Sequence, residues 1–269
     1  KNKLQEMKNQ HHKFFFLIAL PRSGNTLFAS IINQNPEIVC TGNSITLEIM
    51  KELYLLKRID AFQNFPDHKS LDNILDNVYN LYYKDWNQKI IIDRGPVMLS
   101  GNPGNFELMQ KHFKKPFKCI VLLRDLMDVL ASYMQWYTEN PDSFVNKLGS
   151  NDEEKLFQIM HKEGGIAKEL NAIKNAFKNP SMCHFVKYDD IVVNPEKEFK
   201  KIYNFLEEPY YLHYFENLKQ ININGISYDD TVVGKNMHKV WSGKVKKTYN
   251  PYIEKIPQII RKKYEHIRF

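Results

Sequence analysis

The first residues whose types and spacing could do chemistry form the segment PRSGNTL, from Pro21 to Leu27. Seven apolar residues (14–20) precede it, and a pattern with helical spacing (26–33) follows. A tight turn between a buried strand and a helix leaves backbone N–H groups free at the positive end of the helix dipole. Gly24 would let the backbone close on a phosphate, and Arg22 would add a fixed positive charge. The predicted anion site comprises Arg22, Ser23, Gly24, Asn25, Thr26 and Leu27.

This segment differs from the phosphate-binding loop of nucleoside triphosphatases. That loop has the pattern G-x-x-x-x-G-K-[ST], whereas here no Gly stands at its start and no Lys follows Gly24. No obvious acidic Mg²⁺ ligand accompanies the loop, although Asp93 and Asp125 stand at expected strand ends. Triphosphate hydrolysis is therefore disfavoured. An ordinary strand-to-helix turn, in which Ser23 and Asn25 serve only as caps, is the alternative to an anion site.

A second cation and hydroxyl pair follows the apolar segment FKCIVLL (117–123). Arg124 comes directly after that segment, and Ser132 lies eight residues later, two turns along a helix expected to begin at Asp125. Such a pair could bind a second phosphate of the same nucleotide. In the alternative interpretation, Asp125 or Asp128 caps the helix and pairs with Arg124.

The elements that must position these residues alternate along the chain. We expect buried strands at 14–20, 89–93, 117–123 and 184–187, and helices at 26–33, 46–56, 71–83, 125–136, within 151–178 and at 196–206. Strands alternating with helices predict an α/β fold, a central and mainly parallel sheet flanked by helices. Ligands of such sheets bind outside the carboxyl ends of the strands, so we expect both cationic sites to share one cleft.

Composition narrows the class of protein. The 269 residues, 43% of them hydrophobic, suit one domain with a core at about 14–252 and an N-terminal extension at 1–13. A net charge of +7 favours anionic ligands, but acids are scattered among the bases, which disfavours nucleic acid. Cys40, Cys119 and Cys183 are widely spaced, which favours free thiols in a cytoplasmic compartment. No membrane-spanning run is evident, although an upstream anchor could have been removed before Lys1.

Two motifs together resemble the sulfotransferases that use 3′-phosphoadenosine 5′-phosphosulfate (PAPS). PRSGNT (21–26) is similar to their 5′-phosphosulfate loop, above all in the tyrosylprotein branch, and RDLMDVLAS (124–132) to their 3′-phosphate signature. The resemblance implies a P-loop-type nucleotide-binding fold, PAPS as donor and its bisphosphate PAP as product. It also places Tyr188 beside the adenine. A late loop that closes over the nucleotide would include Ser242, Gly243 and Lys244.

The resemblance leaves the general base open. Cytosolic members use a His after the second strand and tyrosylprotein members a Glu after the first helix, but here those places hold IIIDRGP and Asn43. Asp93 is the sharpest candidate, since burial would raise its pKa, unless it is a structural carboxylate paired with Arg94. Arg94 would support the sulfuryl group. Glu48 is the second candidate and His238 a weaker one, and neither the mechanism nor residue spacing calls for a metal.

The acceptor stays undetermined by the sequence. We expect a hydroxyl or amine acceptor, bound in a cleft between helices at 46–83 and 133–178 with aromatic residues such as Trp86, Trp136 and Tyr137. Two other functions stay open. One is a non-catalytic nucleotide-binding protein, and the other is a P-loop phosphotransferase of the kinase type, which would need Mg²⁺ and the missing loop Lys.

Overall fold

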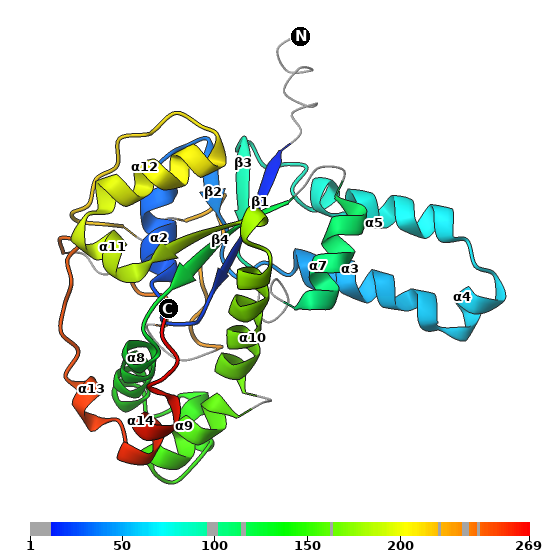
Figure 1. Ribbon diagram of the computed structural model, residues 1–269. Helices are drawn as coiled ribbons and strands as arrows, with labels where there is room; N and C mark the ends of the chain where they lie inside the picture. Colours follow the sequence, from blue (N-terminus) through cyan, green and yellow to red (C-terminus); the bar gives the residue numbers. More distant parts are fainter. Residues whose placement is uncertain are drawn as a thin grey trace.

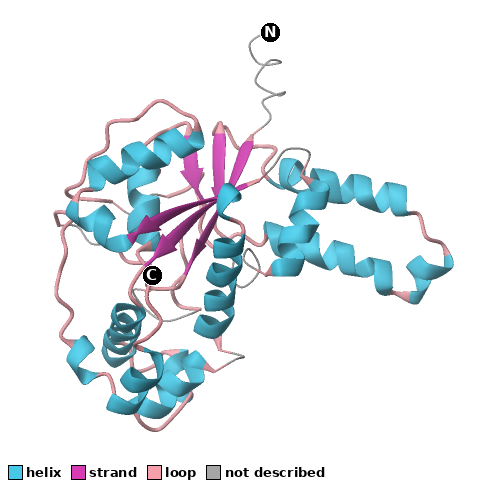
Figure 2. Ribbon diagram, in the orientation of Figure 1, coloured by secondary structure: helices cyan, strands magenta, loops and turns pink. Residues whose placement is uncertain are grey.

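A single parallel sheet forms the centre of the computed structural model, which describes residues 12–95, 102–113, 117–161, 164–219, 222–232, 237–240 and 243–269. The five strands of this sheet lie in the order β2-β3-β1-β4-β5. They are β1 (Lys13–Ala19), β2 (Ile38–Cys40), β3 (Ile90–Asp93), β4 (Lys118–Leu123) and β5 (Cys183–Lys187). Figure 2 shows them fanned out between layers of helices. The expected α/β architecture is confirmed, and β2 is a strand that the sequence patterns did not reveal.

The central strand β1 brings the charged turns to one edge of the sheet. It pairs with β3 on one side, where Phe16 lies opposite Asp93, and with β4 on the other, where Ala19 lies opposite Leu122. Because all these strands are parallel, the segments that follow them leave from the same edge. Chain order reverses at β1, since β3 and β2 extend one way and β4 and β5 the other. Such a switch point opens a crevice at the carboxyl ends.

Alternate residues of β1 point to opposite faces and build two apolar layers. Phe15, Leu17 and Ala19 pack with α2 (Asn25–Ile32), α11 (Tyr188–Val193) and α12 (Pro195–Leu206). Phe16 and Ile18 pack on the other face. Both faces are therefore buried, which explains why the strand has no polar alternation.

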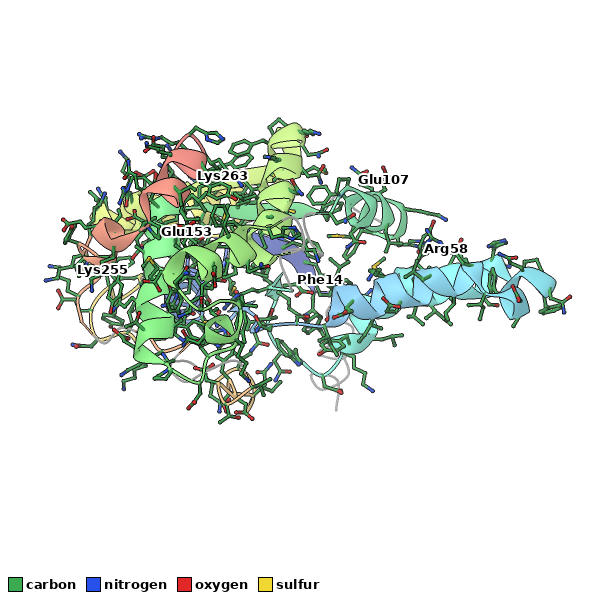
Figure 3. All side chains as sticks on the ribbon, turned by 90° about the horizontal axis from the view of Figure 1, so that it is seen from below. Phe14, Arg58, Glu107, Glu153, Lys255 and Lys263 are labelled. Atoms are coloured by element: carbon green, nitrogen blue, oxygen red, sulfur yellow. The ribbon has the colours of Figure 1, made fainter. Side chains whose placement is uncertain are left out.

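Helices of the second face fall into two groups. The core group includes α7 (Pro103–His112), α8 (Leu126–Glu139) and α10 (Gly165–Lys178). The other group forms a projecting arm, in which α3 (Thr46–Leu55) and α5 (His68–Tyr82) lie side by side and α4 (Asp60–Asn64) forms the tip (Figure 1). In Figure 3 this arm, which carries Arg58, extends away from the body of the protein.

The C-terminal helices close the lower end of the body. There α13 (Tyr252–Lys255) packs on α8, and α14 (Gln258–Tyr264) packs on α8 and α9 (Asp152–Met160), as Figure 1 shows. The short 3-10 helices are η2 (Leu56–Arg58), η3 (Phe144–Lys147) and η4 (Pro180–Met182). No helix within the described ranges is long and apolar enough to span a bilayer.

The expectation that Trp136 and Tyr137 line the acceptor cleft was wrong. Trp136 and Tyr137 are 3% and 2% exposed and belong to the core, so they do not line a cleft. Trp86 packs against the same core. Trp136 packs on Phe144 with ring centroids 6.0 Å apart, and the hydroxyl of Tyr137 donates to Oδ1 of Asp152 at 2.9 Å, so contacts within the protein occupy both side chains.

Candidate active site

A cavity of about 740 Å³ opens at the carboxyl ends of the central strands. Its basic lining residues come from five separate segments: Arg22, Arg94, Arg124, His238, Lys239, Lys244 and Lys246. Glu169 is the one acidic residue among the described lining residues. A smaller hollow of about 280 Å³ lies at the amino ends of β2 and β3, where Lys89 is already paired with Glu208. The large cavity is therefore the site suited to an anion.

The turn after β1 takes the shape expected of an anion site. No side chain caps the N-terminus of α2, so the first amides of that helix keep their donors available. Gly24 has a φ of 94°, and a Cβ there would lie 2.6 Å from Cδ2 of Tyr188. Only glycine meets both conditions. Arg22 also adopts a positive φ, 66°, which costs energy and turns its side chain into the cavity.

The Arg22 guanidinium connects three parts of the site. Its Nε donates to Oγ of Ser132 at 3.1 Å, and its Nη1 donates to the carbonyl of Met237 at 3.0 Å. Burial lowers the pKa of Arg22 from its ordinary value, but a guanidinium in a protein stays charged. A desolvated, fixed positive charge therefore faces the cavity.

Arg124 lies directly against the same turn. Its Nη1 donates to the backbone carbonyl of Arg22 at 2.6 Å, and its guanidinium lies 4.2 Å above the Tyr188 ring. Its Nε is buried without a hydrogen-bond partner. Asp125 accepts from the amide of Met127 and so caps α8, as the alternative interpretation expected. Arg22 and Arg124 therefore line the same cavity.

Other predicted residues of the turn are distributed between the cavity and its support. Thr26 and Leu27 line the cavity. Asn25 also borders it, but its side-chain amide donates to the carbonyl of Leu20 at 3.2 Å and so holds the turn. Ser23 is 1% exposed and is not a lining residue, so its hydroxyl role stays a prediction that this conformation does not favour.

The late basic segment borders the cavity as well. Gly243 and Lys244 are lining residues, and Lys244 Nζ lies 3.3 Å from Glu216 on the surface. Ser242 lies outside the described residues. A long irregular segment from the C-terminal part of the chain thus covers the crevice between β1 and β4.

Comparison with known proteins agrees with this geometry. The model of one family, described as "Sulfotransferase family", matches residues 15–211, which include both cationic motifs. This chain belongs to the sulfotransferase family. A relative from Caenorhabditis briggsae, named "Putative protein-tyrosine sulfotransferase", is 26% identical over 219 residues, which are 78% of this chain and 72% of the relative.

Solved structures of sulfotransferases share the fold. The sulfotransferase domain from the curacin biosynthetic pathway has a TM-score of 0.53 and 17% identity, covering 97% of this sulfotransferase and 93% of that chain. A mouse sulfotransferase complexed with PAP has a TM-score of 0.51 and 13% identity, covering 99% and 87%. At these identities the likeness concerns the architecture. The family assignment rests on the sequence match.

Arg94 of this sulfotransferase faces the cavity from the end of β3. Its Nη1 donates to the hydroxyl of Tyr228 at 2.9 Å, and its amide donates to Oγ1 of Thr41 at 2.8 Å. Neither contact neutralises its charge. Neither carboxylate oxygen of Asp93 has a hydrogen-bond partner within the described part of the chain, so the alternative of a carboxylate paired with Arg94 is not supported.

Asp93 lies beneath the cavity floor. Its side chain is 1% exposed, it is not a lining residue, and neither carboxylate oxygen has a hydrogen bond within 3.5 Å. Burial raises the pKa of Asp93 from 3.8 to about 6, against a smaller lowering by the nearby hydroxyls of Tyr79, Ser44 and Tyr83. A carboxylate held here is a poor candidate for reaching an acceptor.

The buried carboxyl of Asp93 predicts a dependence of stability on pH. Because its pKa is higher in the folded state, Asp93 favours folding fully below pH 3.8, and this contribution is lost as pH rises through about 6. Asp93→Asn should therefore raise the free energy of unfolding by roughly 2–3 kcal/mol at pH 8 and hardly at all at pH 3.5. Urea titrations at both pH values measure this difference.

Asp85→Asn provides the matched control for that experiment. The Asp85 side chain is 86% exposed, so its substitution should leave the pH dependence of stability unchanged. A gain for Asp93→Asn that is larger at pH 3.5 than at pH 8 would contradict the assigned environment.

Three further titratable groups stand in different places. Glu48 is exposed on α3 and is not a lining residue, so the structure does not bring it to the cavity. His238 does line it. Glu169 on α10 is the residue that sequence reasoning missed. It is 6% exposed, its Oε2 has no hydrogen bond, and burial raises its pKa well above 4.5.

Proposed function

We propose that this sulfotransferase moves the sulfuryl group of PAPS to a hydroxyl or amine acceptor by in-line displacement. The observation that carries the proposal is the convergence of the 22–26 turn and Arg124 on one cavity. A phosphosulfate would bind the free amides at the uncapped start of α2, and a 3′-phosphate would bind the guanidinium of Arg124, which lines the cavity.

The transition state of this transfer spreads negative charge over the sulfuryl oxygens and the departing bridging oxygen. Positioning and fixed positive charge supply most of the acceleration in such reactions. Arg22 would neutralise the departing phosphate, and Arg94 would support the sulfuryl oxygens. Ser132, which holds Nε of Arg22, would keep that guanidinium in place. When bound, PAPS supplies the activated sulfuryl group.

The remainder of the nucleotide has a matching surface. The ring of Tyr188, packed between Gly24 and Arg124, offers an aromatic edge to a purine. Gly243 and Lys244 would cover the nucleotide from the late segment. The three cysteines are free thiols, which supports a reducing compartment such as the cytoplasm. The acceptor class, a phenol, sugar, steroid or peptide, is open to a screen with labelled PAPS.

Thermal shift separates this function from its rivals. PAP should raise the melting temperature without Mg²⁺, equivalent to about 2.7 kcal/mol at a concentration one hundred times Kd. AMP, which lacks the 3′-phosphate, should require far higher concentrations, and so should ATP. A response to ATP that depends on Mg²⁺ would favour a kinase-like enzyme instead, and equal responses to PAP and AMP would remove the bisphosphate site.

A further inference from the structure

A histidine and an aspartate form a hydrogen-bonded pair at the rim of the cavity. Nδ1 of His238 lies 2.6 Å from Oδ1 of Asp230, and the backbone amide of His238 donates to Oδ2 of the same carboxylate at 3.1 Å. An ionised carboxylate can only accept, so Nδ1 carries the proton. That tautomer leaves the lone pair on Nε2, the ring nitrogen remote from Asp230.

Two neighbouring residues fix the plane of this imidazole. The ring of Tyr228 stacks on His238 with centroids 3.9 Å apart and an angle of 7° between the planes. The hydroxyl of Tyr228 accepts from Arg94. The imidazole is thus held from its edge and its face.

The pair belongs to the same site as the arginines. His238 is 7% exposed and lines the cavity with Arg22 and Arg94. Arg22 donates to the carbonyl of Met237, the residue before His238. We propose that His238, oriented by Asp230, is the general base that takes the acceptor's proton, an inference that rests on the proposed sulfuryl transfer.

The step balances without a further reactant. The acceptor oxygen forms a bond to sulfur while the bond between sulfur and the bridging oxygen breaks. The electron pair of that bond stays on the 5′-phosphate of PAP, beside Arg22. The acceptor proton passes to Nε2 of His238, which later releases it to solvent, and Asp230 stabilises the intervening imidazolium.

The carboxylates of the chain are less suited to this role. Asp93 is buried below the floor, and Glu48 is exposed away from the lining. Glu169 does line the cavity, but burial raises its pKa well above 4.5, which favours the protonated carboxyl. A protonated carboxyl can donate a hydrogen bond to an acceptor but cannot take its proton.

The surroundings of His238 keep it neutral at pH 7. Burial lowers its pKa below 6.5, the hydrogen bond that it donates to Asp230 raises it, and the charges of Arg94 and Arg22 lower it. The net lowering means that the base form is already present at neutral pH. The rate should therefore fall only on the acid side, as protonation of His238 removes the base.

The kinetic test uses two substitutions and a matched control. His238→Gln should lower kcat for transfer from labelled PAPS to 4-nitrophenol or to a tyrosine peptide by about 10²–10⁴-fold. Asp230→Asn should lower kcat less and move the acid limb of the profile, because the imidazole loses its orienting partner. His266→Gln changes an exposed histidine and should leave kcat unaltered. The melting-temperature shift with PAP should persist in all three variants.

Nuclear magnetic resonance of the ring nitrogens provides a readout that needs no acceptor. His238 should show the tautomer protonated at Nδ1 in the unmodified protein and lose it in Asp230→Asn. A tautomer protonated at Nε2, or turnover unchanged in His238→Gln, overturns the dyad. The dyad is also overturned if Glu169→Gln abolishes turnover and His238→Gln retains it. If PAP fails to stabilise the unmodified protein, the assignment of PAPS as the sulfuryl donor is refuted instead. The tautomer measurement is independent of that assignment.

Discussion

Arg22→Ala should reduce kcat for sulfuryl transfer by about 10³-fold, the largest kinetic effect that we expect from a single substitution outside the base. The guanidinium is desolvated and aimed into the cavity, and it would meet charge that develops on the departing phosphate. A cation in such an environment acts more strongly than one in water, since little solvent screens it. Single-turnover rates with saturating PAPS measure the loss.

Arg22→Lys and Arg58→Ala make that experiment specific. Lysine keeps the charge but not the two directed hydrogen bonds to Ser132 and Met237, so a loss of about tenfold is expected. Arg58 lies on the projecting arm, distant from the body in Figure 3, and its removal should leave the rate unchanged. Equal rates for Arg22→Ala and the unmodified enzyme would exclude Arg22 from the reaction.

The sheet and the two cationic motifs could be predicted because they depend on local patterns and one topological rule. Residues 14–20 and 117–123 read as strands buried on both faces, and parallel strands end at a common edge. From those two facts, Arg22 and Arg124 are predicted to lie close together, and the loop conformations are not needed for this prediction. Ile38–Cys40 gave no such signal, since three apolar residues after Pro36 and Glu37 are too few to distinguish a strand from a loop.

The sequence before α7 carries a recognisable signal for the start of a helix. The helix Pro103–His112 begins with Asn102 accepting from the amide of Gly104 and with Pro103 in the first turn, a combination typical of helix starts. Glu169 has a different signal, which is its place in the apolar pattern of α10. It stands between Ile166 and Leu170 on the buried face of its helix, where a lone carboxylate is costly unless a ligand or proton compensates it.

The His238 site depends on contacts that no periodicity encodes. His238, Tyr228 and Asp230 belong to an irregular segment, and their positions depend on the stacking of Tyr228 on His238 and on the hydrogen bonds from His238 to Asp230. Such a segment has no repeating pattern from which a burial face can be read. Asp93 illustrates the converse. Its place at a strand end was predictable, whereas its burial depends on Tyr79 of α5 and on Tyr83, which follows the end of that helix.

The second large effect is expected from Arg124→Ala, which should weaken PAP binding by about 10²-fold. Arg124 lines the cavity, and its guanidinium would bind the 3′-phosphate through charge-assisted hydrogen bonds. Titration calorimetry with PAP and AMP measures the change in each affinity. AMP affinity should fall only slightly, because AMP has no group for this guanidinium to bind.

That comparison of ligands also separates recognition from support of the turn. Arg124 donates to the carbonyl of Arg22, so its loss could loosen the phosphosulfate loop and weaken every nucleotide alike. If PAP and AMP lose affinity by the same factor, Arg124 only holds the loop and the 3′-phosphate binds elsewhere. If PAP alone loses affinity, Arg124 binds the 3′-phosphate directly. The site then prefers a bisphosphate because Arg22 and Arg124 line the same cavity.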